Sequence, residues 1–404
     1  MNILFLTIGM FDSINQRSVY TDLLRRFAQD GHQVYAVCSR EKRMGLSTEL
    51  FHEGNAQILK VRIGNITKTN LIEKGISTLR IEKEYIDAIN KHFKGVKFDL
   101  ILYSTPPITL AGTIQRLKKR DGAKTYLMLK DIFPQNAVDI GMMKKTGVKG
   151  ILYHYFRSKE KTLYNISDWI GCMSPANVDY VLKNNSWIDS NKVEICANTV
   201  EPQDLSVDQH GRDVLREKYQ IPLDKKVFVY GGNLGKPQDI PFIIQCLKSQ
   251  MSNRDVYFLI VGDGTEFGKL EQFFYENQPQ NMKLLKRLPK EDYDHMIAAC
   301  DVGLIFLDHR FTIPNFPSRL LSYTQAKLPV LACTDPNTDV GKVCVDGGFG
   351  WWCESNDTVA FSENVEVALS ADLIAMGGNA FAYMVDNYHV DSSYDTIMKH
   401  MAEI

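Results

Sequence analysis

The chain has 404 residues, 44% of them hydrophobic, with 47 basic and 48 acidic side chains. This length is sufficient for two globular domains, each with its own core. A formal net charge of −1 excludes a global electrostatic attraction to nucleic acid, so an anionic partner must be met by a local cluster.

The first half of the chain predicts a parallel sheet. An amphipathic helix is expected from about Ser18 to Gln29, between the first two apolar runs. Short strands alternating with helices are typical of a parallel sheet covered on both faces. The predicted strands are 3–8, 33–38, 99–104 and 125–130.

A second series of the same kind begins near residue 226. The polar segment 198–224 is expected to connect the two series, and each series predicts a doubly wound α/β domain with a cleft between the two. Its strands are expected to start near 226 and to cover 256–264, 282–288, 302–307 and 328–333, with helices at 240–250, 266–276 and 291–299.

The cysteines and the first residues indicate a cellular compartment. Eight cysteines occur singly, without metal-ligand spacing, which favours buried free thiols in a reducing environment. The segment "MNILFLTIGM" lacks the basic region and cleavage site of a signal peptide, and no apolar run approaches the roughly 20 residues that span a bilayer. We expect a cytoplasmic protein.

Two turns of the second series have the composition of phosphate-binding loops. The motif Gly-x-Gly-x-x-Gly and the Walker loop are both absent, and the first strand is followed by Gly9 alone. The glycine turn 231–236 contains Lys236 and suits a phosphate, whereas for Gly262-Asp263-Gly264 a simple tight turn is the favoured interpretation. A helix starting near Pro317 would offer backbone N–H groups to an anion, although proline is also an ordinary helix start.

Four stretches of the second half resemble the donor domain of a GT-B glycosyltransferase: "VYGGNLGKPQDI", "FLIVGDGTE", "LPKEDYDHMIAACDVGLIFL" and "PNFPSRLLSYTQAKLPVLA". The resemblance is to the retaining family 4, in its capsule, O-antigen and exopolysaccharide (fucosaminyltransferase-like) branch. The first half resembles the acceptor domain of that branch more weakly, through "GHQV", "LKDIFPQNAVDIG" and "CMSPANVDYV".

This resemblance implies the α/β GT-B fold, which has two Rossmann-like parallel-sheet domains with an interdomain cleft. It places an acceptor-binding domain at 1–200, a nucleotide-sugar donor domain at 201–384 and a C-terminal helix at 385–404 that crosses back to the first domain. The donor-binding residues it implies are Gly232, Asn233, Lys236, Gln238, Arg287, Leu288, Asn315, Pro317, Ser318, Arg319, Leu320 and Ser322.

The sequence departs from the family pattern at two places. Asn233 and Gln238 stand where members carry Arg and Lys, and Lys236 is the nearest cation that can substitute. Pro314 and Ser322 stand where members carry two glutamates, which puts ribose recognition in doubt. Ser322 and Gln325 lie nearly one helical turn apart and can still offer polar groups to the ribose.

Asp131 is the predicted catalytic residue of the acceptor domain. It follows a central strand, where a carboxylate can orient or deprotonate an acceptor hydroxyl, or can simply form a turn. Gly9 and Thr105 are expected at the same acceptor-side cleft. His32 is interpreted as structural, and the nine histidines form no ligand set.

The resemblance implies transfer, with retention, from a nucleotide-diphosphate sugar, favoured as UDP-linked, to a polyprenyl-diphosphate-linked saccharide. No metal or other cofactor and no nucleic acid partner are expected. The segment 142–162 interleaves basic and apolar residues, which fits an anionic membrane surface or an exposed helix packing its aromatics inward. The alternatives are a GT-B sugar-nucleotide epimerase and a catalytically inactive partner of polysaccharide assembly.

Overall fold

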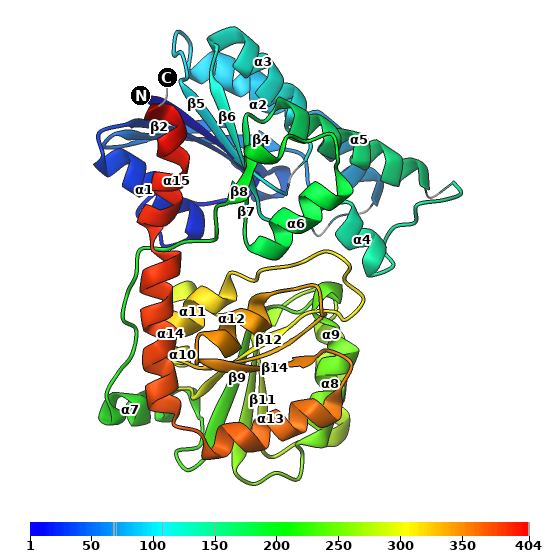
Figure 1. Cartoon of the computed structure of the whole chain (residues 1–404), viewed down its shortest axis with the longest axis vertical. Coiled ribbons are helices and arrows are strands. Elements are labelled where there is room, and N and C mark those ends of the chain that lie inside the picture. The colour runs from blue at the N-terminus through cyan, green and yellow to red at the C-terminus, as the bar shows by residue number, and fades with distance from the viewer. Residues whose placement is uncertain (68, 70, 107, 149, 403–404) are drawn as a thin grey trace. The chain divides into compact units, whose positions relative to one another are not determined.

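The computed structural model describes residues 1–67, 69, 71–106, 108–148 and 150–402, with the backbone alone at 71, 72, 74 and 75. Lys149, one of the basic residues of segment 142–162, lies outside the described residues. The chain divides into two compact units, shown in Figure 1. Unit 1 comprises Met1–Glu201 with Val390–Ile404, and unit 2 comprises Pro202–His389.

Unit 1 is a largely parallel sheet with the strand order β3-β4-β2-β1-β5-β6-β7-β8, in which β3 is antiparallel to β4. The strands are β1 (Asn2–Leu6), β2 (Gln33–Glu41), β3 (Glu49–Glu53), β4 (Ala56–Ile63), β5 (Leu100–Ser104), β6 (Lys124–Leu129), β7 (Trp169–Cys172) and β8 (Val193–Ile195). The helices are α1 (Val19–Gln29), α2 (Leu71–His92), α3 (Ala111–Asp121), α4 (Gln135–Asp139), α5 (Gly150–Ile166), α6 (Pro175–Asn184) and α15 (Val390–Ala402), with short 3₁₀ turns at Lys42–Met44 and Ser190–Lys192.

The C-terminal helix α15 completes the core of unit 1 by packing on α1. Tyr394 contacts Phe27, with ring centroids 5.1 Å apart, and Arg26 forms an ion pair with Asp391 at 2.6 Å. Val390 at the start of α15 is fully buried in the same cluster as these rings. The last part of the chain therefore belongs to the first folding unit, because its apolar face has its partners there.

Unit 2 is a parallel sheet with the strand order β11-β10-β9-β12-β13-β14. The strands are β9 (Lys226–Asn233), β10 (Val256–Asp263), β11 (Met282–Lys286), β12 (Val302–Phe306), β13 (Val330–Thr334) and β14 (Gly350–Glu354). The helices are α7 (Gln209–Tyr219), α8 (Ile240–Ser249), α9 (Phe267–Asn277), α10 (Lys290–Ala298), α11 (Arg319–Gln325), α12 (Val340–Asp346), α13 (Thr358–Ser370) and α14 (Leu373–Tyr388), with a 3₁₀ turn at Lys236–Gln238.

The apolar runs predicted as strands are confirmed as β1, β2, β5 and β6 in unit 1 and as β9 to β13 in unit 2. The helices expected at 240–250, 266–276 and 291–299 are confirmed as α8, α9 and α10. The polar segment 198–224 is more ordered than a simple connection, because it contains α7. Asp208 accepts the Gly211 N–H to cap that helix, and Arg216 pairs with Asp301 at 2.7 Å.

All eight cysteines are buried free thiols, as the sequence predicts. Within the described parts of the chain, no single helix has the length and apolar character needed to cross a membrane. Helices α13 and α14 reach that criterion only when taken together, and they are bent by 104° relative to each other.

The closing segment forms two helices where one was expected. Helix α14 ends at Tyr388, His389 adopts an extended conformation, and α15 starts at Val390. Residue 385, the expected start of the closing helix, lies inside α14, and the break between the two helices falls at the limit between the two units.

Candidate functional site

The sheet of unit 2 reverses its direction of strand addition between β9 and β12. In the described register these strands pair at Val302 and Gly303 of β12, near their amino ends. Beyond that point Tyr323 of α11 fills the space between them. Its hydroxyl accepts a hydrogen bond from Gly231 N at 3.1 Å and lies 3.0 Å from the carbonyl oxygen of Leu304. The carboxyl end of β9 is thus the switch point at which open α/β sheets bind ligands.

Arg319, the first residue of α11, places an unpaired positive charge at this edge. Its guanidinium carbon lies 4.3 Å from the ring centroid of Tyr230, and its Nη1 is buried without a hydrogen-bond partner. Among the described residues it forms no ion pair with a carboxylate. Gly232 has φ 133°, and a Cβ there would lie 3.3 Å from Nη2 of Arg319. A guanidinium held in this way is well suited to bind an anion with charge-assisted hydrogen bonds.

Tyr293 of α10 brings a second buried donor to the same strand end. Its hydroxyl is buried and lacks a hydrogen-bond partner in the described structure. A Cβ at residue 231 would collide with this hydroxyl, so Gly231 permits the close approach of the ring. An unsatisfied buried hydroxyl costs about 1–3 kcal/mol. Tyr293 and Arg319 are therefore both suited to donate to a ligand oxygen at the end of β9.

We expect Tyr293→Phe to raise the free energy of unfolding by about 1 kcal/mol, because it removes a buried hydroxyl without a partner and keeps the ring. The same change is expected to weaken binding of a nucleoside diphosphate by about tenfold, the usual value of one hydrogen bond to a charged group. Urea unfolding and calorimetry with UDP measure the two effects. Tyr275→Phe is the control, because that ring is 82% exposed. Destabilisation of Tyr293→Phe would contradict the assignment.

The loop after β9 is closed by two neutral amides. Nδ2 of Asn233 donates to Oε1 of Gln238 at 2.8 Å, and the same oxygen accepts the Gly235 N–H at 3.2 Å. Gln238 is buried, whereas Lys236 is exposed at the surface of the loop. Asn233 and Gln238, which replace the expected cations, thus fix the conformation of the loop. Lys236 is the positive charge that this loop presents to solvent.

Helix α11 starts two residues later than expected. Ser318 occupies the N-cap position but makes no side-chain capping bond, and Pro317 lies before the helix. The N–H groups of Leu320 and Leu321 donate to the carbonyl oxygens of Pro317 and Ser318 at 3.2 and 3.1 Å. The tight first turn therefore satisfies donors that the sequence analysis expected to be free, and the side chain of Leu320 is fully buried.

Gln325 has a structural role that differs from the predicted one. Its Nε2 donates to the carbonyl oxygen of Leu321, and its Oε1 accepts the Gln203 N–H at 3.3 Å. Its side chain therefore holds the segment that enters unit 2. Ser322 is partly exposed on the same helix and remains the polar side chain at the position of the missing second glutamate, whereas Pro314, at the position of the first, is buried.

The remaining predicted donor residues lie near the carboxyl edge of the sheet of unit 2. Arg287 and Leu288 follow β11, where Arg287 is exposed and Leu288 is partly buried. Asn315 lies in the loop before α11, and its N–H donates to Oγ1 of Thr338 at 3.0 Å.

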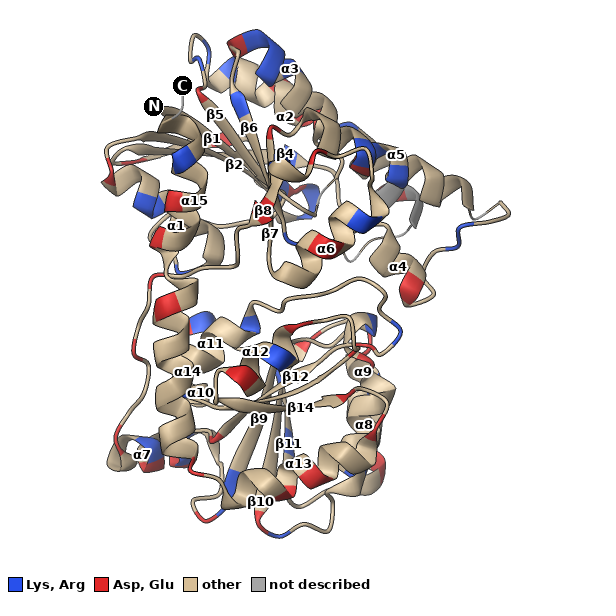
Figure 2. Ribbon diagram, in the orientation of Figure 1, with Lys and Arg blue, Asp and Glu red and all other residues tan. Residues whose placement is uncertain are grey.

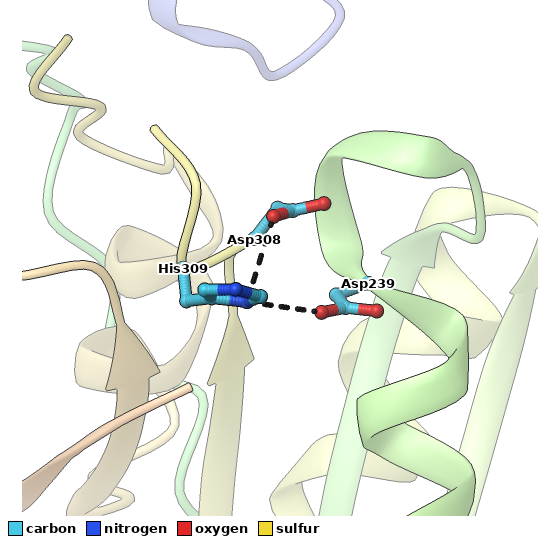
Figure 3. Close-up of side chains that lie close together, drawn as sticks. All are labelled: Asp239, Asp308 and His309. Carbon is cyan, nitrogen blue, oxygen red and sulfur yellow. Dashed lines mark ion pairs between the residues drawn. The ribbon is translucent and has the colours of Figure 1, made fainter. Parts of the chain in front are cut away.

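Asp239, Asp308 and His309 form a polar cluster between the loop after β12 and the start of α8 (Figure 3). Nδ1 of His309 lies 3.5 Å from Oδ2 of Asp239 and 3.8 Å from Oδ1 of Asp308. The three ligand atoms lie within 4.8 Å of one another, a spacing compatible with a metal ion. However, the buried carboxylate of Asp308 already binds the guanidinium of Arg310 at 2.5 and 2.8 Å. We therefore interpret the cluster as a structural contact between the loop after β12 and the start of α8.

Asp131, Thr105 and Gly9 follow β6, β5 and β1, which are neighbours in the sheet of unit 1. The hydroxyl of Thr105 donates to the carbonyl oxygen of Asp131 at 3.0 Å and accepts the N–H of Lys130 at the same distance. Gly9 is exposed, and its N–H donates to Oγ1 of Thr7. The structure therefore brings the three predicted acceptor-side residues to one edge of the sheet.

The carboxylate of Asp131 is only partly exposed. Burial raises its pKa to about 6, and this outweighs the two hydrogen bonds from Nδ2 of Asn136, both at 2.8 Å, which lower the pKa. The nearby carboxylate of Glu160 adds a small increase in the pKa. A carboxyl group with a pKa near neutrality can accept or return a proton at cellular pH.

Residues 211–376 match the family model described as glycosyl transferases group 1. The chain also shares its fold with solved GT-B glycosyltransferases. The protein is a glycosyltransferase with the GT-B fold. Its candidate donor residues from Gly232 to Ser322 all lie within the matched segment.

Two curated relatives and one solved structure are similar to this glycosyltransferase. WbjE of Pseudomonas aeruginosa, named a probable glycosyltransferase, is 25% identical over 337 residues, covering 83% of this chain and 81% of WbjE. WcaI of Escherichia coli K12, named for colanic acid biosynthesis, is 23% identical over 61% of this chain and 60% of WcaI. The Anabaena HepE structure in complex with UDP has a TM-score of 0.68 and 12% identity, covering 100% of this chain and 99% of HepE.

The sequence pattern of this glycosyltransferase does not mark Tyr230, Tyr293 or Tyr323 as parts of the site. Each lies in an apolar or amphipathic stretch and is typical of a core residue. The pair Gly231-Gly232 was the available signal, because adjacent glycines at the end of a buried strand indicate close approach by another group. That signal shows where side chains converge but does not reveal which ones.

Proposed function

We propose that the protein transfers a sugar, with retention, from a UDP-linked donor to a polyprenyl-diphosphate-linked saccharide in the synthesis of a bacterial surface polysaccharide. The observation that carries the proposal is the unpaired guanidinium of Arg319 beside Gly232, at the switch point of unit 2. Two names support it: WcaI is named for colanic acid biosynthesis, and HepE was solved with UDP. The branch similar to fucosaminyltransferases is part of the proposal.

The donor chemistry accounts for the residues at this edge. When the glycosidic bond breaks, negative charge develops on the diphosphate, and preorganised donors stabilise that charge. Arg319 supplies a fixed guanidinium, the Tyr293 hydroxyl supplies a neutral donor, and Lys236 supplies an exposed cation. This set of cations and donors can neutralise a diphosphate, so we propose a reaction that requires no metal ion.

On the acceptor side, we propose that Asp131 orients the acceptor hydroxyl and receives its proton or passes it on. In retaining transfer the departing phosphate can act as the base, so the carboxylate of Asp131 need not be a strong one. Its raised pKa is compatible with this limited role, because the group is largely ionised at pH 7 yet easily protonated.

A donor panel tests this function. The protein is incubated with UDP-linked sugars and a synthetic polyprenyl-diphosphate saccharide, and the lipid product is identified by mass spectrometry. A product whose mass increases by one sugar supports transfer, and NMR of the new linkage tests retention. Conversion of the nucleotide sugar without an acceptor would indicate an epimerase instead. Failure to bind UDP at millimolar concentration would indicate an inactive assembly partner.

We also propose that the segment 142–162 contacts an anionic membrane surface. Lys and Arg residues lie along α5 (Figure 2), and several large apolar side chains of this segment are exposed. Val148 is 86% exposed, Ile151 70% and Leu152 52%. Other members of the segment pack inward or pair: Phe156 contacts Phe133 at 5.0 Å. The exposed apolar residues beside cations are typical of an interfacial helix.

We expect Ile151→Ser with Leu152→Ser to reduce binding to vesicles containing anionic phospholipid by about tenfold, because burying two such side chains is worth several kcal/mol before the cost of ordering the lipid contact. Vesicle sedimentation measures the effect. Ile374→Ser in unit 2 is the matched control, because that side chain is 89% exposed on a different helix. Equal binding of the double variant and the wild type would disprove the membrane contact.

A further inference from the structure

Unit 1 contains a cavity of about 1080 Å³ that none of the predicted site residues lines. One wall is a face of α2 that carries Glu73, Ser77, Arg80 and Glu84, with the spacing of successive helical turns. Residues at the ends of β2 and β4 form the opposite wall. The volume is at the upper end of that of small-molecule sites, so it can hold a ligand larger than a single phosphate.

The position of the cavity relates it to the acceptor side. Strands β2 and β4 run parallel to β1, β5 and β6, so their carboxyl ends lie along one edge of the sheet. Asp131 follows β6, which is four strand spacings from β4, or roughly 19 Å along that edge. The cavity is therefore a separate site on the edge that carries Asp131.

Three cations line this cavity, and two of them act on carboxyl groups of the same lining: the charge of Lys42 lowers the pKa of Glu73, and that of Arg80 opposes the rise in the pKa of Glu84. In the described structure, the side chains of Lys42, Arg62 and Arg80 form no ion pair. Neighbouring arginines behave differently: Arg40 pairs with Glu49 at 3.0 Å and Arg43 with Glu41 at 3.3 Å. Unpaired cations around a concave surface attract an anion, and arginine forks match the oxygens of a phosphate.

Glu84 adds a second kind of contact to the cavity. Its Oε2 is buried without a hydrogen-bond partner, and burial raises the pKa of this carboxyl group, whereas the charge of Arg80 lowers it. A buried carboxylate oxygen needs a donor, and a sugar hydroxyl is a suitable one. Gly64 makes the arrangement possible, because a Cβ at that position would collide with Ser77 and push α2 away from β4.

We propose that this cavity binds a phosphorylated saccharide, with its phosphate on Lys42, Arg62 and Arg80 and a sugar hydroxyl on Glu84. This identification of the ligand as part of the acceptor rests on the proposed function. The site would hold the phosphate-bearing portion of the acceptor, so that the reacting hydroxyl lies further along the same edge, toward Asp131.

Calorimetry on the full chain saturated with UDP tests the proposal, with glucose 1-phosphate, glucose and inorganic phosphate as separate probes. We expect glucose 1-phosphate to bind at least about tenfold more tightly than either of the other two, because only it uses both kinds of contact. Arg62→Gln with Arg80→Gln is expected to weaken its binding by about tenfold or more, since two charge-assisted contacts are lost. Both side chains are exposed, so the fold should survive.

Two further variants sharpen this test. Lys83 lies on α2 but does not line the cavity, so Lys83→Gln should leave the affinity for glucose 1-phosphate unchanged. Glu84→Gln should weaken the binding of glucose 1-phosphate relative to that of inorganic phosphate, because only the sugar contacts Glu84, whereas the loss of a negative charge beside Arg80 favours both phosphates alike. Equal affinity for inorganic phosphate and glucose 1-phosphate, no effect of the double variant, or no binding of any probe would each overturn the proposal. None of these three outcomes would alter the binding of UDP by the wild type. If the wild type failed to bind UDP, that result would instead reject the proposed function.

Discussion

Replacing Arg319 with alanine is expected to weaken UDP binding by about 100-fold and to reduce transfer at least as much, because the diphosphate loses charge-assisted bonds worth about 1.5–3 kcal/mol each. The guanidinium is already held over the Tyr230 ring and against Gly232, so little ordering cost is paid on binding. Calorimetry with UDP and initial rates with the UDP-sugar measure the two effects.

The matched variants separate charge from geometry. Arg319→Lys keeps the charge but loses the planar fork, and it should recover only part of the affinity. Arg254→Ala removes an exposed arginine just before β10, at the amino end of the strands and away from the carboxyl edge, and should leave UDP affinity unchanged. Unchanged UDP affinity in Arg319→Ala, with an unaltered unfolding transition, would show that the diphosphate binds elsewhere.

The sheet of unit 2 was predictable because its strands are apolar runs that end at turns. In β9 and β10 the run stops at glycines, and burial on both faces leaves no polar interruption before them. Strand β4 was missed for the opposite reason, because Lys60 and Arg62 interrupt its apolar pattern. Lys60 is nevertheless buried and pairs with Asp12 at 2.7 Å. Such a partner is distant in sequence, so local pattern cannot reveal it.

The site was predictable to the level of residue type. Arg319 was identified from the stretch "PNFPSR", and the structure adds that its guanidinium stacks on Tyr230. Asn233 and Gln238 were recognised as uncharged replacements, but their mutual hydrogen bond depends on the loop conformation. Gln325 was assigned to the ribose because it shares a helix face with Ser322. In the structure its side chain instead accepts a hydrogen bond from the N–H of Gln203, which is distant in sequence. Competition of this kind is decided by tertiary structure.

Asp131→Asn is expected to lower the rate of transfer by about 100-fold, in the range of general acid–base or orienting groups. In the wild type, activity should rise with pH through an apparent pKa near 6, because the ionised carboxylate is the form that binds the acceptor hydroxyl. The asparagine variant should lose that dependence. Asp139→Asn on α4 is the control, because that carboxylate accepts a hydrogen bond from Gln135 at 2.6 Å nearby.

The raised pKa of Asp131 also predicts that the stability of the protein falls as the pH rises, which is opposite to the pH dependence of its activity. The pKa of Asp131 is raised from 3.8 to about 6 in the folded protein, so between these values the folded state binds a proton that the unfolded state does not. Its contribution to the free energy of unfolding is therefore fully present below about pH 3.8, the unfolded pKa, and falls by roughly 3 kcal/mol as the pH rises to 7. The stability of Asp131→Asn relative to the wild type should increase over this interval, as urea unfolding at several pH values would measure. A constant difference would mean that the carboxyl group is not desolvated. A rising difference with lost activity would show that unit 1 sacrifices stability to keep an ionisable group at the acceptor edge.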